Sequence, residues 1–291
     1  MPVAIEVDIN HLFFWDAIWF ADTPFAINRV VLLMLLASVM CMAFFLWGAR
    51  KKRIVPKGTQ SIAETGYLVV RNNIAIDTIG PEGAKYAPYL ATVFFFIFFN
   101  NLLEIIPGIN FPTPSRMAIP IFLALLTWLI FNIVGIIKQG PFRYFKDTLF
   151  PPGLPGGVMG FVIKILLAII ELFSVFIIRP LTLAIRLLAN MMAGHVLLTI
   201  FFLFTHDFLI ENFKLATAPL GIVTLLVACL LIVFELLVIS IQAYIFTMLT
   251  AFYIAESIHG HGDHDEEHAQ DEDHKAIEAP ESARETELQP A

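Results

Sequence analysis

The residues whose types and spacing most suggest chemistry lie in one strongly apolar segment, residues 161–204. This segment contains two arginines, Arg179 and Arg186, together with Asn190 and His195. A charged side chain at the centre of a bilayer costs at least ~2.5 to 3.5 kcal/mol on insertion scales, and an arginine cannot avoid this cost by losing its proton. Arg186 is therefore a permanent cation, and a cation at this depth needs a compensating role.

These four residues fall on two sides of the helix that the segment predicts. Arg186 and Asn190 lie seven and eleven residues after Arg179. At about 100° per residue, all three share one helical face. His195 follows Arg186 by nine residues and points to roughly the opposite side. One face therefore carries fixed charge and an amide, and the other carries a group that can take up and release protons near neutral pH.

A second polar set lies in the next apolar segment, where Glu235 and Gln242 are seven residues apart and share a face. If the two segments form helices that pack antiparallel around a turn near residue 208, residues equidistant from that turn lie opposite one another. Arg186 then faces a window that contains Gln242, and His195 faces a window with Glu235 at its edge. The sequence therefore predicts both polar pairings.

Two explanations of these polar residues remain open at this point. Interhelical hydrogen bonds in a membrane are worth only ~0.6 to 2 kcal/mol, and simple ties between helices would account for the two amides. This explanation suits Arg186 less well, because no acid lies three or four residues from it. A carboxylate on another subunit, which approaches and leaves, would supply its counter-charge. His195 with Glu235 and Glu171 would suit a proton path.

Conventional catalysis has little support in this sequence. It contains no serine elbow, no HExxH, no Gly-rich phosphate loop and no CxxC pair. Cys41 and Cys229 lie in apolar runs without metal-ligand spacing. We therefore expect no catalytic residues, no cofactor and no metal site. Five histidines after residue 258 would allow metal binding, but we favour a solvated tail there.

The composition places the chain in the membrane. Of its 291 residues, 58% are hydrophobic, 28 are phenylalanines, and the mean hydropathy is +0.78. These values lie far outside those of an ordinary soluble domain. The net charge of -7 arises largely in the last thirty or so residues, and nothing indicates a nucleic-acid partner. The sequence thus predicts an all-α, polytopic membrane protein.

The apolar runs predict the order of the helices. One N-terminal span is followed by an amphipathic surface helix at residues 59–79, then by a helical hairpin. The two final segments are too long for a ~30 Å hydrocarbon core, so each must be either broken or steeply tilted. Pro180 and Gly194 are the candidate break points in the first segment. We favour two long tilted helices joined by a turn at residues 205–212. The predicted spans are residues 25–47, 86–106, 117–137, 158–205 and 213–255.

Flanking charges predict the orientation in the membrane. The basic cluster RKKR at residues 50–53 directly follows the first span and marks the cytoplasmic side. Residues 1–24 then form an external interfacial segment without a removable signal peptide. The membrane domain is residues 25–258, and residues 259–291 form an acidic, His-containing, disordered cytoplasmic tail. The acidic character begins at Glu256, which we group with that tail.

Three runs of residues resemble subunit a of the F-type ATP synthase, and the similarity spans about residues 25–258. Residues 179–195 (RPLTLAIRLLANMMAGH) resemble its signature helix, and residues 235–253 (ELLVISIQAYIFTMLTAFY) resemble its final helix. Residues 101–107 (NLLEIIP) resemble its first half-channel motif. The arginine, amide and glutamine occur in the same order in two long helices, which makes the resemblance specific.

The resemblance implies a role for each polar residue. Arg186 would meet the carboxylate of each passing c-ring subunit and prevent a proton short circuit, with the two amides as its polar neighbours. His195 and Glu235 would line the external half-channel, with its entrance at Asn101 and Glu104. Glu171 and Arg179 depart from the pattern, because their spacing is one residue longer than in some members. The residues implied in proton translocation are Arg186, Asn190, Gln242, His195, Glu235, Glu171, Asn101, Glu104, Arg179 and Tyr253.

The resemblance also implies partners and a location. The chain would be a stator subunit without a catalytic site of its own, in a multi-pass arrangement in the bacterial plasma membrane. It would contact c-ring subunits, peripheral-stalk b subunits and the lipid bilayer, and protons would be the transported ion. A stand-alone secondary transporter or channel, with metal ions as the candidate substrate, is the main alternative, but such proteins often show inverted repeats, which this sequence lacks. A membrane enzyme would need a catalytic cluster at one membrane face.

Overall fold

Helices form every regular element that this computed structural model describes, and no strand occurs in the described part of the chain. The prediction of an all-α protein is therefore confirmed. Among the described residues, four helices are long and apolar enough to cross a membrane, and a further apolar helix is shorter. The predicted external segment and acidic tail lie outside the described residues, apart from His259. The described residues are 28–50, 58–106, 117–149, 158–211, 214 and 217–259.

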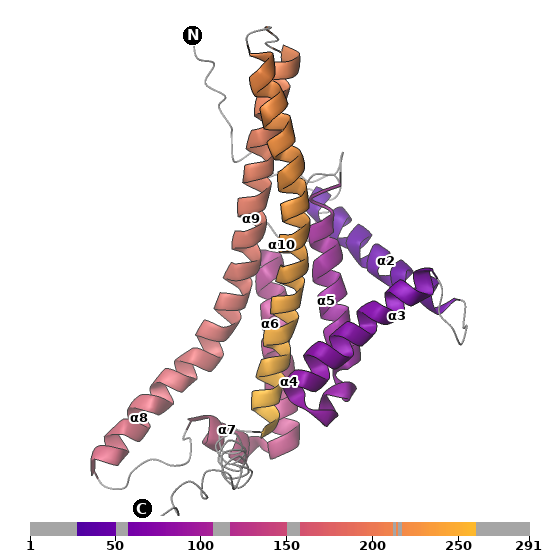
Figure 1. Cartoon of the computed structure of the whole chain (residues 1–291). Helices are drawn as coiled ribbons and strands as arrows, with labels where there is room; N and C mark the ends of the chain where they lie inside the picture. The colour runs from indigo at the N-terminus through magenta and orange to yellow at the C-terminus, as the bar shows by residue number, and fades with distance from the viewer. Residues whose placement is uncertain are drawn as a thin grey trace, which may run out of the picture.

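The N-terminal part contributes one membrane-length helix and one oblique helix. Helix α2 (Arg29–Ala49) precedes a continuous helical stretch made of α3 (Thr59–Val69), the π-helical η1 (Val70–Ile76) and α4 (Asp77–Ile79). This stretch coincides with the predicted amphipathic helix. Its second half buries a row of apolar side chains against α5 and α10, and α3 runs obliquely beside α2 (Figure 1). The buried row consists of Val70, Ile74, Ala75 and Ile79.

A short 3₁₀ turn, η2 (Pro81–Lys85), leads into the predicted hairpin of α5 (Ala87–Leu102) and α6 (Ala118–Gln139). Helix α5 ends earlier than the predicted span, because residues 103–106 form turns before Pro107. The sequence analysis did not predict α7 (Pro141–Leu149). Gly140 has a φ of 81°, which allows the chain to turn sharply between α6 and α7. Tyr144 of α7 is buried, and its ring packs directly over Gly135 of α6.

The long segment after residue 157 bends at a π-helical insertion. Helix α8 (Val158–Phe173) continues through η4 (Ser174–Ile178) into α9 (Arg179–His206), and Figure 1 shows α8 diverging from the line of α9. The bend precedes Pro180, whose ring excludes the carbonyl four residues earlier and whose nitrogen donates no hydrogen bond. A break at Gly194 is wrong, because α9 is continuous there. Gly194 instead allows the Glu235 carboxylate to lie close to the backbone of α9.

Helix α10 (Ala218–His259) has 42 residues and runs antiparallel to α9 (Figure 1). Its length of roughly 63 Å exceeds the ~30 Å hydrocarbon core by a factor of two. The predicted turn at residues 205–212 is misplaced, because α9 and the π-helical η5 (Asp207–Glu211) continue the helix through Glu211. The hairpin therefore extends further before it turns. Its turn end projects past α5 and α6.

The core lies where α10 packs on α5, α6 and α9. Small side chains allow close approach of these helices, as is usual between membrane helices. Ala184 of α9 and Ala243 of α10 are almost fully buried in one cluster, which also contains Phe246. This contact fixes the register of α9 against α10. The register in turn decides which polar residues of the two helices meet.

Candidate functional site

Arg186 lies on the exposed side of α9. Its neighbours Leu183, Ala184 and Leu187 are buried, and α9 packs against α6 and α10, so the helical period turns Arg186 and Asn190 outward. No ion pair joins Arg186 to a carboxylate of the described residues. A permanent cation in an apolar, membrane-length helix thus points away from the subunit's own core. An anionic group can approach it from outside.

An interhelical hydrogen bond fixes the amide next to this arginine. Asn190 Nδ2 donates to Gln242 Oε1 across 2.7 Å, and Gln242 is only 1% exposed. The sequence predicted Arg186 opposite Gln242, and the structure instead pairs Gln242 with Asn190, one turn further along α9. Gln242 Nε2 is buried and has no hydrogen-bond partner among the described residues. A donor therefore remains available beside the arginine.

A second cluster of polar residues is buried on the other side of α9. His195, Glu104 and Glu235 are 3%, 0% and 5% exposed, and His195 Nδ1 lies 3.9 Å from Glu104 Oε1. A Cβ atom at Gly194 would lie 2.3 Å from Glu235 Oε1, so the Glu235 carboxylate rests against the backbone of α9 beside His195. The three ionisable groups come from α10, α9 and the turn after α5. The chain thus folds three distant segments together at this point.

Several polar atoms of this cluster have no hydrogen-bond partner among the described residues. Both carboxylate oxygens of Glu104, both side-chain polar atoms of Asn101 and Glu235 Oε1 are buried without a hydrogen bond in the described part of the chain. Leaving such groups unpaired costs a few kcal/mol, and native proteins usually satisfy them with water. Carboxyl and imidazole groups can both accept and release protons near neutral pH.

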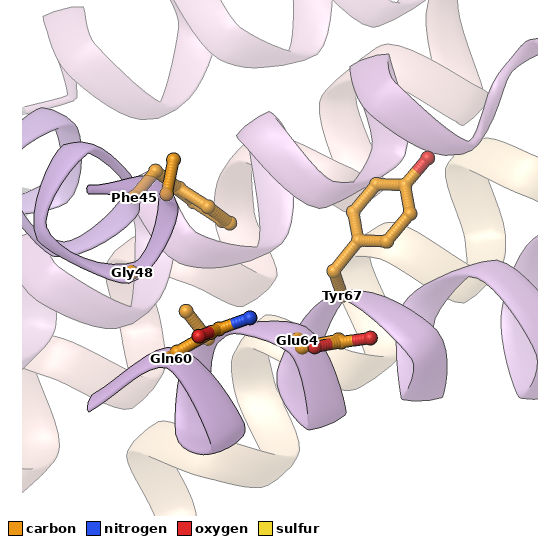
Figure 2. A pocket seen from close by; sticks show the side chains of 7 residues that line it. Phe45, Gly48, Gln60, Glu64 and Tyr67 are labelled. Carbon is orange, nitrogen blue, oxygen red and sulfur yellow. The ribbon is translucent and has the colours of Figure 1, made fainter. Parts of the chain in front are cut away.

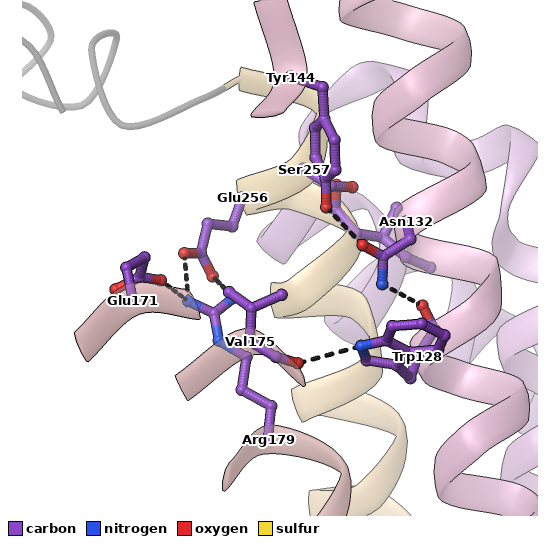
Figure 3. A network of polar contacts seen from close by, with 9 residues as sticks. Trp128, Asn132, Tyr144, Glu171, Val175, Arg179, Glu256 and Ser257 are labelled. Carbon is purple, nitrogen blue, oxygen red and sulfur yellow. Dashed lines mark hydrogen bonds and ion pairs between the residues drawn. The ribbon is translucent and has the colours of Figure 1, made fainter. Parts of the chain in front are cut away.

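A third cluster surrounds Arg179, and Figure 3 shows how its members approach one another. Glu256 accepts two hydrogen bonds, from Arg179 Nη1 at 2.6 Å and from Arg179 Nη2 at 2.7 Å. Glu171 accepts a third from Nη2 at 2.8 Å. The guanidinium also lies 5.3 Å from the centroid of the Tyr253 ring. Arg179 is thus neutralised within the subunit, in contrast to Arg186.

Glu256 corrects the sequence analysis, which grouped it with the acidic tail. It belongs to the last turns of α10 and is packed against the membrane part of the chain. A signal for this was present in the sequence, because Glu256 follows Gln242 by fourteen residues. Fourteen residues amount to nearly four helical turns, which returns the side chain close to the same face. The acidic composition of the following residues obscured this signal.

The π-helical insertion explains the unexpected spacing of Glu171 and Arg179. Eight residues in a regular α-helix leave two side chains about 80° apart around the axis. The wider turn of η4 accommodates one additional residue, so Glu171 rotates back toward Arg179. Trp128 of α6 donates from Nε1 to the Val175 carbonyl of the insertion at 3.1 Å. This bond satisfies a carbonyl that the insertion draws out of the regular pattern.

The other pockets in the described structure are lined by few ionisable side chains. Figure 2 shows a pocket between α2 and α3, where Phe45 and Tyr67 approach Glu64 and Gln60. Glu64 is the one ionisable carboxylate in its lining. Within the described ranges, no group of three or more His, Cys, Asp or Glu residues is arranged to hold a metal ion. The three clusters along α9 and α10 are therefore the candidate site.

Comparisons with known proteins agree with one another. The family model described as ATP synthase A chain matches residues 31–255. The ATP synthase subunit a of Rhodococcus erythropolis is 40% identical over 248 residues, which cover 85% of this chain and 88% of that protein. Subunit a of a Parafrankia species is 46% identical over 229 residues, or 77% and 75% of the two chains. That of Gluconacetobacter diazotrophicus is 38% identical over 226 residues, or 78% and 86%. This chain therefore belongs to the ATP synthase subunit a family.

Proposed function

We propose that the chain is the proton-translocating stator subunit of a rotary F-type ATP synthase. In this proposal the chain forms two offset half-channels against a ring of c subunits. Arg186 separates the half-channels and couples proton flow to rotation of the ring. The chain has no catalytic site of its own and acts as part of the ATP synthase complex. Its family and its four apolar membrane-length helices support this proposal.

The observation that carries the proposal is the outward position of Arg186 without a carboxylate partner among the described residues. A permanent cation at such a depth is stabilised by a mobile anion that visits it. A protonated rotor carboxylate is neutral and can travel through lipid. As it approaches Arg186 it gives up its proton, because the nearby positive charge favours the carboxylate form.

The other two clusters lie on opposite sides of Arg186 along α9. His195 follows it by nine residues and Arg179 precedes it by seven, which correspond to about 13 and 10 Å along the axis. The cluster of Glu104, His195 and Glu235 supports an external half-channel. The region of Glu171, Arg179 and Tyr253, near the end of α10, supports the cytoplasmic one. A proton must travel with the ring to pass from the external half-channel to the cytoplasmic half-channel.

The proposal also specifies the membrane, the orientation and the partners of the chain. The chain is a multi-pass protein of the bacterial plasma membrane, with its N-terminus outside and its C-terminus in the cytoplasm. Its partners are the c-ring, whose carboxylates face Arg186, the peripheral-stalk b subunits and the lipid bilayer. Each elementary charge that crosses contributes ~2.3 kcal/mol per 100 mV, and several charges combine for each ATP.

Substitution of Arg186 by alanine tests this function. Inverted membrane vesicles that contain the whole complex should lose ATP-driven proton pumping, because the rotor carboxylate loses its fixed counter-charge. Thr182→Ala is the matched control, because Thr182 is also exposed and lies one turn earlier on α9. It should pump normally. Coupled pumping that persists undiminished in Arg186→Ala would refute the proposal.

A further inference from the structure

The buried cluster beside His195 needs a route by which protons reach it from outside the subunit. Asn101 and Glu104 have no exposed surface, and His195 and Glu235 have almost none. None of these side chains can take up a proton directly from external water. The route must therefore include residues that lie between the cluster and the surface of the subunit.

The face of α9 that carries His195 continues outward with two further polar residues. Thr199 follows His195 by four residues and His206 by eleven, which correspond to about 6 and 16 Å along the axis. At about 100° per residue, both lie within about 40° of His195 around the helix. Thr199 Oγ1 is buried and has no hydrogen-bond partner among the described residues, whereas His206 is exposed. A polar row thus runs from the buried cluster to an exposed imidazole.

A pocket of about 560 Å³ opens along the same face of α9. Thr199 lines it, so the pocket begins one helical turn beyond His195. A water molecule takes up ~30 Å³ of liquid, so a pocket of this volume has room for a continuous chain of water molecules. Thr205 adds another hydroxyl, which lies 3.1 Å from Thr224 Oγ1 of α10. The complete lining is Thr199, Phe202, Leu203, Thr205, His206 and Ile210.

The outer end of this pocket lies near the turn of the α9–α10 hairpin. The turn end projects past α5 and α6, so these helices do not cover this part of α9 (Figure 1). Asp207, Glu211 and Lys214 all lie within eight residues of His206. Charged side chains are costly in hydrocarbon, and such a group of them indicates the boundary between membrane and water. The pocket thus extends from the buried cluster toward that boundary.

We propose that protons enter the external half-channel through this pocket, with His206 at its mouth and Thr199 as the link to His195. The inference rests on the proposed function, because it presupposes that the cluster beside His195 receives protons from outside. The imidazole of His206 can take up a proton and release it to water in the pocket. The Thr199 hydroxyl can accept a proton from that water as it gives up its own toward His195. A groove filled by a lipid chain is the competing explanation, because half of the lining is apolar.

Thiol modification from the external side tests the position of the mouth. Cys41 and Cys229 are first replaced by alanine, and His206→Cys then places a thiol in the pocket. Spheroplasts that contain the whole complex are treated with a bulky, membrane-impermeant thiol reagent, and inverted vesicles are prepared from them. We expect ATP-driven proton pumping to fall by at least about tenfold relative to the untreated variant, because the adduct fills the passage.

Glu211→Cys is the matched control for this modification. Glu211 is exposed at the same end of the hairpin and does not line the pocket. The control should be modified to the same extent and should pump at its untreated rate. A thiol at position 206 that stays unmodified, or a modified complex that pumps at its untreated rate, would overturn the proposal.

A second pair of variants tests the link at Thr199. Thr199→Val removes the hydroxyl at almost unchanged volume, and we expect it to lower pumping by about threefold or more, the effect of losing one hydrogen bond. Thr199→Ser keeps the hydroxyl and should pump close to the original rate, with equal amounts of both variants in the assembled complex. A lipid groove predicts the opposite order, because valine is the more apolar residue. Thr199→Val that pumps as fast as Thr199→Ser would overturn the inference even if His206→Cys failed to assemble. The Arg186→Ala test would still stand, so a failure here is distinguishable from a failure of the proposed function.

Discussion

Addition of one methyl group at Gly194 should disable the proposed proton path without unfolding the subunit. A Cβ atom at this position would lie 2.3 Å from Glu235 Oε1, 2.5 Å from Cδ and 2.6 Å from Oε2, whereas ordinary contact begins at 3.4 Å. The Glu235 carboxylate must therefore withdraw by about 1 Å from α9. It can do so by side-chain rotation, because the overlapping atoms are the far end of a flexible side chain.

The expected effect is on transport rather than on folding. A displacement of about 1 Å within a proton-transfer group can cost up to about a hundredfold in rate, so we expect Gly194→Ala to pump at least tenfold more slowly. Alanine favours a helix over glycine by ~1 kcal/mol, so α9 itself is not weakened. The assay is ATP-driven proton pumping in inverted vesicles. The amount of assembled complex is measured in parallel.

A shorter acid at position 235 provides the matched compensation. Glu235→Asp shortens the side chain by one methylene, about 1.5 Å, which exceeds the required withdrawal. The double variant Gly194→Ala with Glu235→Asp should pump faster than Gly194→Ala alone, and Glu235→Asp alone is the control. Normal pumping by Gly194→Ala would refute the reasoning that the Glu235 carboxylate must lie against α9. A double variant slower than both single variants would refute the steric cause.

Two further predictions concern the α6–α7 region, where Figure 3 shows the contacts. Trp128→Phe removes the 3.1 Å hydrogen bond to the Val175 carbonyl and should lower the free energy of unfolding by about 1 kcal/mol. Hydrogen exchange of the backbone amides at residues 174–178 should become faster, and unchanged exchange would contradict this prediction. Burial raises the pKa of Tyr144 to about 12, and its hydroxyl donates to Asn132 Oδ1 at 3.0 Å. Because the folded state disfavours the phenolate, the contribution of neutral Tyr144 to the stability of the fold is complete below the ordinary tyrosine pKa of about 10. This contribution is lost as the pH rises to about 12. Thermal unfolding in detergent should therefore show a smaller alkaline loss in Tyr144→Phe than in the original protein, and equal losses would exclude Tyr144 as the cause.

The three clusters also explain why two arginines can share one apolar helix. Arg179 is stabilised within the subunit by two carboxylates and the ring of Tyr253. Arg186 has no such arrangement among the described residues and depends on a group from outside. The same residue type thus serves folding at one position and, in the proposed function, serves the moving partner at the other.

The amino-acid sequence by itself determined the helical class and the two faces of α9. These properties follow from hydropathy and from the fixed helical period, which are local and can be read from residue spacing. The sequence also placed Gln242 opposite this part of α9, although it predicted Arg186 as the facing residue and the structure pairs Gln242 with Asn190, one turn further along. The runs around Arg186 carried enough order and spacing to indicate the family.

Only the tertiary structure decided which charges are balanced. The partner of Arg179 lies 77 residues away, at a position where composition indicated a solvated tail. The contact of Glu171 required a π-helical insertion, which depends on Pro180 and on a hydrogen bond from Trp128 of another helix. The burial of Glu104 beside His195 likewise depends on the packing of both α5 and α9 against α10. Charge balance inside a membrane is a property of three-dimensional contacts between distant segments, and local periodicity cannot specify it.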